Sequence, residues 1–405
     1  MSMDGQPGHI DQIKQTNIGA VYRLIDQYGP ISRIELSKKA QLAPASITKI
    51  VRELVDTHLV METEFLDLGF RGRPATGLKL DSESWHLLCV NISLGNLILG
   101  LRDLSGKLIV EDVLPLPASN RKSFLDCITD EIDAFFGRYH SRLERLTAIS
   151  ITINAIVDPI KGLIRDFPYY QIQELSIGEY LHRRIGLPVF LQHEIIAWTM
   201  AESLYGAAKN CQNIIQVVIG ENIGIGVVIA GQTLHASNGS VMEIGHIQAE
   251  PDGERCYCGN LGCLETVAGI SHILSRAKQQ LITAPDSLLN CEPLTIESFC
   301  QAVNKGDTLA MDIIHDIGVK IGHIVAIMVN LFNPEKILIG SPLNTSQQIL
   351  YPVINECIQK HALPAYSKQV QLVATEFNNS GTLSAVSSVK NALYDGSLLV
   401  NLMKG

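Results

Sequence analysis

Long apolar runs are missing from this sequence, since no segment approaches the roughly 18–20 residues that a membrane-spanning helix needs. The first nine residues also lack the basic and apolar regions of a secretory signal. The nine cysteines are odd in number and unevenly spaced, which argues against a disulfide framework. We therefore expect a cytoplasmic protein whose reduced cysteines serve in metal binding or burial.

Charged residues are also scarce, at 18% of 405 residues, whereas hydrophobic residues make up 46%. Such a chain can bury a large core in two or three domains, which excludes wholesale disorder. The net charge of −9 is uneven, because residues 1–80 carry ten basic against nine acidic residues and the acidic excess lies in the remainder. The acidic remainder of the chain repels a polyanion and orients it toward the less acidic N-terminal part. The charge distribution is therefore compatible with DNA binding by the N-terminal part alone.

Residues 17–80 show three helical patterns followed by two strand-like runs. Ser32 can cap a second helix over 33–40, and Pro44 suits the first position of a third. The third helix has one apolar face, and its other face is small, polar and basic, carrying Ser46, Thr48, Lys49 and Arg52. After a tight turn this pattern is typical of a helix that reads the major groove of DNA. The alternative is a three-helix subdomain that binds protein.

A basic tip, Arg71-Gly-Arg73-Pro, lies between the strand-like runs at 59–66 and 77–80. Such a tip is typical of the wing of a winged helix-turn-helix, whose arginines enter a minor groove. We expect Arg71 and Arg73 to contact DNA.

The rest of the chain alternates apolar strand candidates with helical stretches, which predicts an α/β architecture. The strand candidates are 87–101, 148–153, 189–191 and 214–219. We expect a DNA-binding domain at 1–82, a first α/β lobe at 83–195 and a second at 196–405.

The strongest chemical signal is the spacing His-x9-Cys-x-Cys-x4-Cys, formed by His246, Cys256, Cys258 and Cys263. These four ligands suit tetrahedral zinc, and four protein ligands leave no position for a reacting water. We expect one structural zinc ion per chain. The alternative is an ordinary loop with three reduced cysteines.

The segments Glu243-Ile-Gly-His246 and Cys256-Tyr-Cys-Gly-Asn-Leu-Gly-Cys-Leu-Glu265 resemble the signature of the ROK family, which groups bacterial repressors with sugar kinases. The N-terminal segments 29–33, 46–50 and 71–74 resemble its repressor branch. The resemblance implies a winged helix-turn-helix joined to a two-lobed, actin-like ATPase fold of the sugar-kinase type, with an oligomerisation surface in the second lobe. It also implies a repressor of sugar-uptake (phosphotransferase system) genes that binds palindromic double-stranded operator DNA as a homodimer or homotetramer.

Family kinases carry glycine-rich phosphate loops, and three matching segments are changed here. The first reads Asn91-Ile-Ser-Leu-Gly95, the second Gly220-Glu-Asn222 and the third Gly340-Ser-Pro342. A leucine side chain and a carboxylate would occupy phosphate space, so we expect no enzyme activity. The alternative is an ATP-dependent hexose kinase with an appended DNA-binding domain.

The resemblance also maps a hexose pocket onto His193, Glu194, Glu243 and Glu265. Two interpretations stay open: a residual sugar pocket, or carboxylates that only support the zinc loop. A further alternative for the whole chain is a sugar-binding module whose N-terminus docks a protein.

A helical stripe at 124–139 is expected to be core, and Phe136 lies about 100° off it. It is either a flank of the core or an anchor for a partner. The resemblance implies that partner, because repressors of this branch are relieved by a sugar signal and some are sequestered by the dephosphorylated cytoplasmic B domain of the glucose permease. Others respond to a phosphorylated amino sugar. Neither route requires the chain to insert into a membrane.

Overall fold

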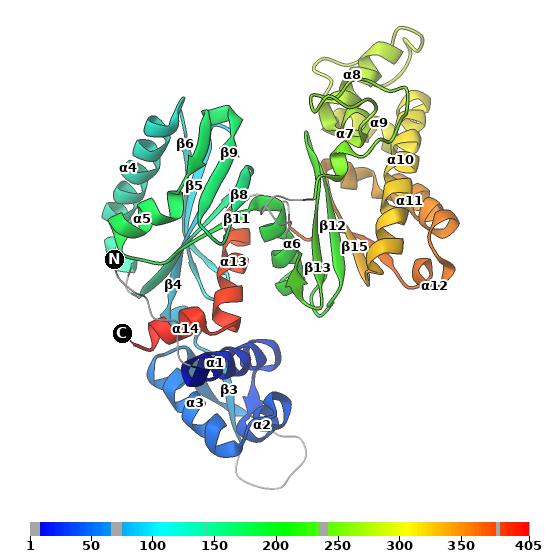
Figure 1. Cartoon of the computed structure of the whole chain (residues 1–405). Coiled ribbons are helices and arrows are strands. Elements are labelled where there is room, and N and C mark those ends of the chain that lie inside the picture. The colour runs from blue at the N-terminus through cyan, green and yellow to red at the C-terminus, as the bar shows by residue number, and fades with distance from the viewer. Residues whose placement is uncertain (1–8, 66–74, 144, 235–241, 378–380, 405) are drawn as a thin grey trace. The chain divides into compact units, whose positions relative to one another are not determined.

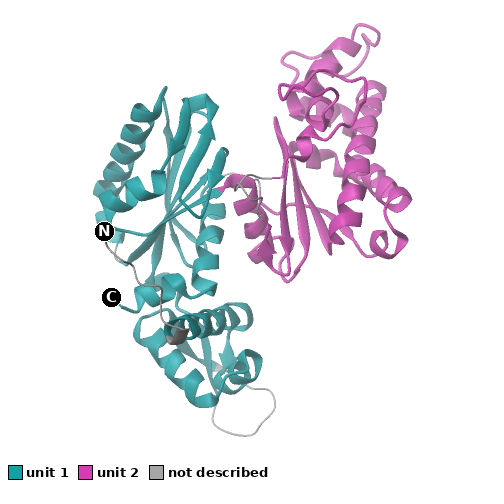
Figure 2. Cartoon of the chain, in the orientation of Figure 1, with its two compact units in different colours: residues 1–192, 381–405 teal, residues 193–380 magenta. Residues whose placement is uncertain are grey.

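The computed structural model describes residues 9–65, 75–143, 145–234, 242–377 and 381–404. The chain divides into one unit of residues 1–192 with 381–405 and a second unit of residues 193–380 (Figure 2). This division differs from the predicted lobe boundary at 195/196, and above all in the last 25 residues, which return to the first unit. Among the described residues, no helix is long and apolar enough to cross a membrane.

The N-terminal part of the first unit contains the three predicted helices and a three-stranded sheet of order β1-β3-β2 (Figure 1). The Ser32 side chain accepts a hydrogen bond from the Glu35 N–H and so caps α2, and Pro44 opens α3. The elements are α1 (His9–Tyr28), β1 (Ile31–Ser32), α2 (Arg33–Ala40), α3 (Pro44–Asp56), β2 (Val60–Phe65) and β3 (Ala75–Leu80).

The main sheet of the first unit has the order β11-β7-β4-β5-β6. The apolar run predicted as one strand at 87–101 is two antiparallel strands, because the chain turns at Leu94-Gly95, where Gly95 has φ +75°. Its strands are β4 (His86–Ser93), β5 (Asn96–Asp103), β6 (Leu108–Pro115), β7 (Leu146–Ile153) and β11 (Val189–His193). A second sheet holds β8 (Ile156–Asp158), β9 (Leu163–Phe167) and β10 (Ile172–Leu175).

Helices lie on both faces of the main sheet. Helix α4 (Arg121–Tyr139) buries Phe124, Ile128, Ile132 and Phe135 in the core that β4, β5 and β7 share, and α5 (Ile177–Ile185) adds Leu181. Helix α13 (Leu383–Tyr394) packs on β4 and β7, where the Ser150 hydroxyl donates to the Ala385 carbonyl at 2.6 Å. The segment before α13 is held by Thr382, whose hydroxyl donates to Glu111 and accepts from Arg102. These contacts explain why the C-terminal segment belongs to the first unit.

The C-terminal helices also hold the N-terminal part. Helices α13 and α14 (Ser397–Leu402) pack against α1. Helix α1 lies very close to the end of α13, since a Cβ on Gly19 would lie 2.3 Å from the Tyr394 carbonyl oxygen. Beside it the Lys390 ammonium, on a side chain that is 1% exposed, is paired with Asp26, and the Tyr394 hydroxyl donates to the same carboxylate at 2.6 Å.

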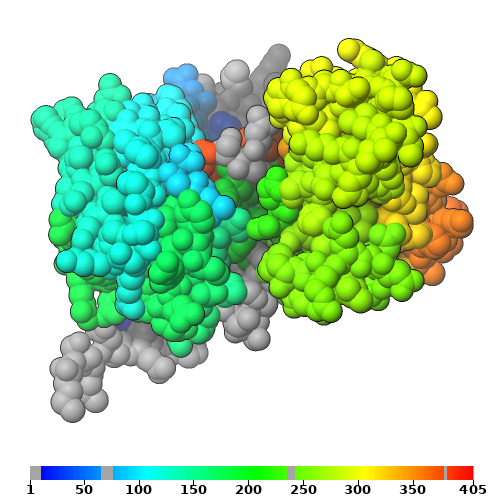
Figure 3. Space-filling model, turned by 90° about the horizontal axis from the view of Figure 1, so that it is seen from above, coloured from blue at the N-terminus to red at the C-terminus, as the bar shows by residue number. Residues whose placement is uncertain are grey.

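The second unit is built on a five-stranded sheet of order β14-β13-β12-β15-β16, with α6 on β12 and β13 and a large apolar core among α7–α11. The yellow to orange atoms in Figure 3 belong to the part of this unit that carries α10, α11 and α12. The strands are β12 (Ile214–Ile219), β13 (Ile223–Ile229), β14 (Gln232–Thr233), β15 (Lys336–Gly340) and β16 (Gln371–Ala374). The helices are α6 (Glu194–Leu204), α7 (Leu264–Ala268), α8 (Ile270–Gln280), α9 (Ile296–Asn304), α10 (Thr308–Phe332), α11 (Gln347–His361) and α12 (Pro364–Ser367).

Candidate metal centre and nucleic-acid interface

The structure brings His246, Cys256, Cys258 and Cys263 together, with one ligand atom from each lying within 4.8 Å of the others. The Cys256 sulfur lies 3.6 Å from His246 Nδ1, and the Cys258 and Cys263 sulfurs lie 3.6 Å apart. Zinc–sulfur bonds of about 2.3 Å and zinc–nitrogen bonds of about 2.0–2.1 Å place tetrahedral ligands about 3.8 Å apart (S···S) or 3.6 Å apart (N···S). The cluster therefore has the size and donor chemistry of a tetrahedral metal site, and it could hold a metal ion.

Tight turns bring these ligands together. The Cys256 N–H donates to the Asn260 carbonyl at 2.8 Å, and the Gly259 N–H donates back to the Cys256 carbonyl at 2.9 Å. Gly262 has φ +63°, and a Cβ there would lie 1.5 Å from the Glu250 carbonyl oxygen, so only glycine fits. The loop conformation thus depends on glycines between the ligands as well as on the ligands.

The surroundings of the cluster match those of a metal centre. Burial, then hydrogen bonding with the Cys258 and Cys256 side chains and the charge of these neighbours, raise the pKa of Cys263 to about 12. Hydrogen bonding, first of all from the Asn260 backbone, lowers the pKa of Cys258. With Nδ1 of His246 as the ligand atom, its Nε2–H donates to the Tyr257 hydroxyl at 3.0 Å and fixes the ring. Tyr257 was not singled out in the sequence, although it lies between two of the ligands.

The two carboxylates beside this loop that were assigned to a hexose pocket, Glu243 and Glu265, differ in burial and in hydrogen bonding. Glu265 is 6% exposed and accepts a hydrogen bond from the Ile223 N–H at 3.1 Å. Glu243 is exposed by area, yet surrounding protein desolvates its carboxyl and raises its pKa, with a further rise from Glu265 and an opposing effect of His246. Glu265 therefore supports β13, whereas the Glu243 carboxyl stays accessible.

The other two residues assigned to that pocket lie where β11 meets α6. His193 caps α6, accepting from the Ile195 N–H through Nδ1 at 3.2 Å, and Glu194 is the first residue of the helix. Burial lowers the pKa of His193 to about 4, so the imidazole is neutral at pH 7.

The first segment predicted to match a kinase phosphate loop forms the β4–β5 turn. The Gly95 N–H donates to the Tyr170 hydroxyl at 2.8 Å, and that hydroxyl donates to the Ser93 carbonyl at 3.0 Å. The Leu94 side chain is 58% exposed at the tip. A tyrosine from 75 residues further along the chain thus uses the backbone donor that a phosphate would need.

The second altered loop is tied to the start of α8. The Glu221 carboxylate accepts from the Ser271 N–H at 3.2 Å, and the Gly220 carbonyl accepts from the Ile270 N–H at 3.0 Å. A carboxylate at a helix N-terminus satisfies the free N–H groups and the positive end of the helix dipole. Glu221 therefore occupies a position that would otherwise attract an anion.

The exposed face of α3 carries all four residues predicted to contact DNA on this helix. Ser46, Thr48, Lys49 and Arg52 are exposed, whereas the opposite face is buried. Among the residues that the structure describes, neither basic side chain is held in an ion pair, so both can reach an external phosphate or base. The wing arginines Arg71 and Arg73 lie outside the described residues.

The adjacent residues Phe135 and Phe136 of helix α4 lie in different environments. Phe135 is fully buried and contacts Tyr139 edge to face, and Phe136 is partly buried at the margin of the same core. Phe136 therefore packs against the edge of the core and keeps part of its surface exposed.

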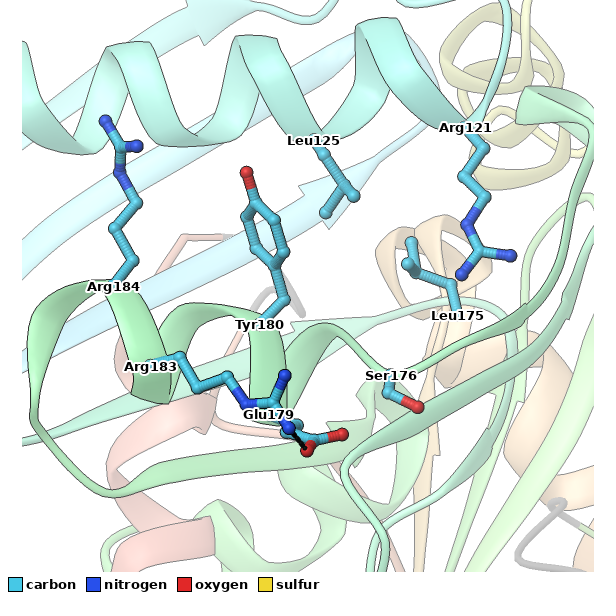
Figure 4. A pocket seen from close by; sticks show the side chains of 8 residues that line it. All are labelled: Arg121, Leu125, Leu175, Ser176, Glu179, Tyr180, Arg183 and Arg184. Atoms are coloured by element: carbon cyan, nitrogen blue, oxygen red, sulfur yellow. Dashed lines mark hydrogen bonds and ion pairs between the residues drawn. The ribbon is translucent and has the colours of Figure 1, made fainter.

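A groove of about 470 Å³ lies between α4 and α5 (Figure 4). Leu125 and Tyr180 face one another in its middle, and Arg121 lies at one end. At the other end Arg184 pairs with Asp133, and the lining also holds the ion pair of Arg183 with Glu179, so the groove combines apolar side chains with arginines and one carboxylate.

Comparisons with known proteins identify the chain's relatives. The model of the ROK family matches residues 87–392. The chain is 53% identical over 406 residues to the DNA-binding transcriptional repressor Mlc of Escherichia coli strain K12, covering 100% of both. It is 37% identical over 399 residues to the DNA-binding transcriptional dual regulator NagC of the same strain, covering 98% of each. The predicted resemblance to the repressor branch of the family is confirmed, and of these two relatives Mlc is the more similar.

Solved structures of ROK-family proteins also resemble this chain. A ROK-family transcriptional regulator described as a homolog of E. coli Mlc superposes with a TM-score of 0.91 at 41% identity, over 98% of this chain and 100% of that one. A ROK hexokinase from Thermus thermophilus gives a TM-score of 0.63 at 22% identity over 75% of this chain and 97% of its own, which shows the fold alone. The predicted α/β fold of the sugar-kinase type is thereby confirmed.

Proposed function

The chain belongs to the ROK family, and from that premise we propose that it is a DNA-binding transcriptional repressor of sugar-uptake genes rather than an enzyme. The observation that carries the proposal is the full-length identity of 53% to a transcriptional repressor, which includes the N-terminal helices. The match therefore covers the N-terminal helices α1–α3 as well as the kinase-type fold.

Helix α3 enters the major groove in this proposal. Ser46 and Thr48 are small enough to let the helix approach the base edges, while Lys49 and Arg52 reach phosphates or guanine. Arg71 and Arg73 of the predicted wing add contacts in the adjacent minor groove. Two copies of the chain, as a homodimer or within a homotetramer, bind the half-sites of a palindromic operator.

The hexose-kinase alternative is disfavoured by the loops. The Gly95 N–H is engaged by Tyr170, and Glu221 places a negative charge at the start of α8. Both features oppose a triphosphate, the first by removing a donor and the second by like-charge repulsion. Glu243 keeps an accessible carboxyl, so weak sugar binding without phosphorylation is compatible with the site.

We assign a structural zinc ion to His246, Cys256, Cys258 and Cys263. Such an ion links the turns of the 246–263 loop and neutralises its thiolates, which contributes to folding rather than to chemistry. The donor set and the 3.6 Å separations support this assignment.

Relief of repression is proposed to occur by sequestration. The dephosphorylated B domain of the glucose permease docks on α4 near Phe136, and the adjoining α4–α5 groove supplies apolar and basic contacts. The repressor then acts in the cytoplasm and reaches the membrane only through that partner.

The test is a gel-shift with operators of sugar-transport genes at several salt concentrations, using the full chain and its Lys49→Ala and Arg52→Ala variants. Loss of a base contact should weaken binding by about 1–3 kcal/mol, and loss of a phosphate contact should reduce the salt slope by about one. Lys107→Ala is the matched control, because Lys107 is exposed and paired with Glu83 outside the N-terminal helices.

Two outcomes contradict the proposal. One is operator binding by both α3 variants that equals that of the parent protein. The other is phosphotransfer from ATP to glucose or N-acetylglucosamine at ordinary enzymatic turnover, which would restore the kinase alternative.

A further inference from the structure

Two histidines from different helices, neither of them among the four ligand candidates of the cysteine loop, meet at the surface of the second unit. His323 lies on α10 and His361 is the last residue of α11. Their Nε2 atoms are 3.1 Å apart, and their rings are nearly perpendicular with centroids 4.5 Å apart. Both residues are exposed, so water and ions have access to the pair.

The separation of the two nitrogens matches that of two ligands on one metal ion. With metal–nitrogen bonds of about 2.0–2.1 Å, neighbouring imidazole nitrogens lie about 2.9 Å apart at a right angle and about 3.4 Å apart in a tetrahedron. The observed 3.1 Å falls between these values. A direct hydrogen bond between two neutral rings spans the same distance and is the competing explanation.

We propose that His323 and His361 bind one divalent transition-metal ion through their Nε2 atoms, at a second site that is independent of the cysteine loop. Imidazole ligands favour Zn²⁺, Ni²⁺ and Cu²⁺ over Mg²⁺ and Ca²⁺, which prefer oxygen. Two protein ligands on an exposed surface leave the remaining positions of the ion to water or to an external donor.

The backbone around His361 is fixed before any ion binds. Asn330 of α10 donates from its side chain to the His361 carbonyl at 3.2 Å and accepts from the Leu363 N–H at 2.7 Å. The end of α11 is therefore tied to α10 beside the histidine pair. Because the two rings need little rearrangement, the ordering cost of binding an ion is small.

Neighbouring charges act in opposite directions on this site. Burial, then His361, Lys320 and Lys360, lower the pKa of His323, which keeps its ring neutral and its lone pair free for a metal. The same lysines repel a cation. Lys320, however, is directed to the Ala249 carbonyl and to Glu250, and water screens charges at an exposed site. The repulsion weakens the site without removing it.

Metal binding has a structural consequence because the ligands come from two helices. Helices α10 and α11 pack closely, and a Cβ on Gly322 would lie 2.6 Å from the Cβ of Cys357. An ion held by both helices stabilises their contact in the folded state alone, so the melting temperature should rise as the free concentration of the ion increases above its dissociation constant.

Isothermal titration of the full chain with NiCl₂, after its cysteine loop has been loaded with one equivalent of Zn²⁺ per chain and free zinc has been removed, tests the proposal. The parent protein should take up one Ni²⁺ per chain, and His323→Gln and His361→Gln should each abolish this uptake. His315→Gln is the matched control, because His315 is exposed on the same helix without a histidine neighbour among the described residues, and it should bind as the parent does. With Cu²⁺, the electron paramagnetic resonance spectrum of the parent should show hyperfine coupling to two imidazole nitrogens.

The proposal is overturned if the parent loaded with one Zn²⁺ per chain binds no further ion, which leaves the hydrogen bond between the rings as the explanation. It is also overturned if both single variants bind Ni²⁺ like the parent. Neither result depends on operator binding, so the proposed repressor function is tested separately.

Discussion

The buried pair of Lys390 and Asp26 should determine how firmly the N-terminal helices are held by the C-terminal ones. Asp26→Ala removes the carboxylate and leaves the ammonium of Lys390 in a site where its side chain is 1% exposed. Breaking a buried pair from one side costs about 3–5 kcal/mol. The side chain of Asp26 is 23% exposed, so water relieves part of the penalty and we expect a value near 3 kcal/mol.

A matched double variant separates the cost of leaving the Lys390 ammonium unpaired from the cost of losing the packing of the Asp26 side chain. Asp26→Ala with Lys390→Met replaces the ammonium with an apolar side chain of similar length. Replacement of a buried ion pair by apolar residues is often close to neutral, so the double variant should recover most of the loss. Lys14→Ala is the surface control, because Lys14 is 51% exposed and its pair with Glu53 should contribute less than about 1 kcal/mol.

Urea unfolding of the full chain measures these differences, and hydrogen exchange in α1 and α13 localises them. The expected order of stability is parent and Lys14→Ala first, then the double variant, then Asp26→Ala. The reasoning is refuted if Asp26→Ala behaves like Lys14→Ala, or if the double variant is as unstable as the single one.

Local patterns in the sequence predicted the parts of the site that local contacts determine. The buried and exposed faces of α3 follow from a period of 3.6 residues, and the cap at Ser32 follows from a hydrogen bond over three residues. The four metal-ligand candidates lie within 18 positions, so turns alone can bring them together. For such features the sequence carries both the residue type and the spacing.

Features that depend on distant segments could not be predicted in this way. Lys390 and Asp26 are 364 positions apart, and neither has a local pattern that identifies the other. The same holds for the hydrogen bonds of Tyr170 to the β4–β5 turn, and for the packing of α13 in the first unit. A helical wheel gave the angle of Phe136 on α4 but not the depth of the neighbouring surface, so its partial burial became visible only in the fold.

Four further variants test the remaining structural claims. Cys256→Ser should lower the zinc content measured by mass spectrometry and the melting temperature together, and a fully stable protein without bound metal would contradict the structural role. Phe135→Ala should cost about 3–5 kcal/mol of stability through a core cavity, whereas Phe136→Ala should cost less and weaken binding of the permease B domain; equal effects on unfolding and none on the partner would exclude the proposed docking surface. His193→Asn tests a pH effect. Burial lowers the folded-state pKa of His193 to about 4, so the unfolded chain binds the extra proton between about pH 6.5 and 4, and stability falls by up to about 3 kcal/mol as the pH drops through that window. Asparagine can still cap α6 but does not titrate, so the variant should lose less stability than the parent between pH 7 and pH 4. Parallel stability curves for the two proteins would show that the His193 imidazole is not desolvated in the folded chain.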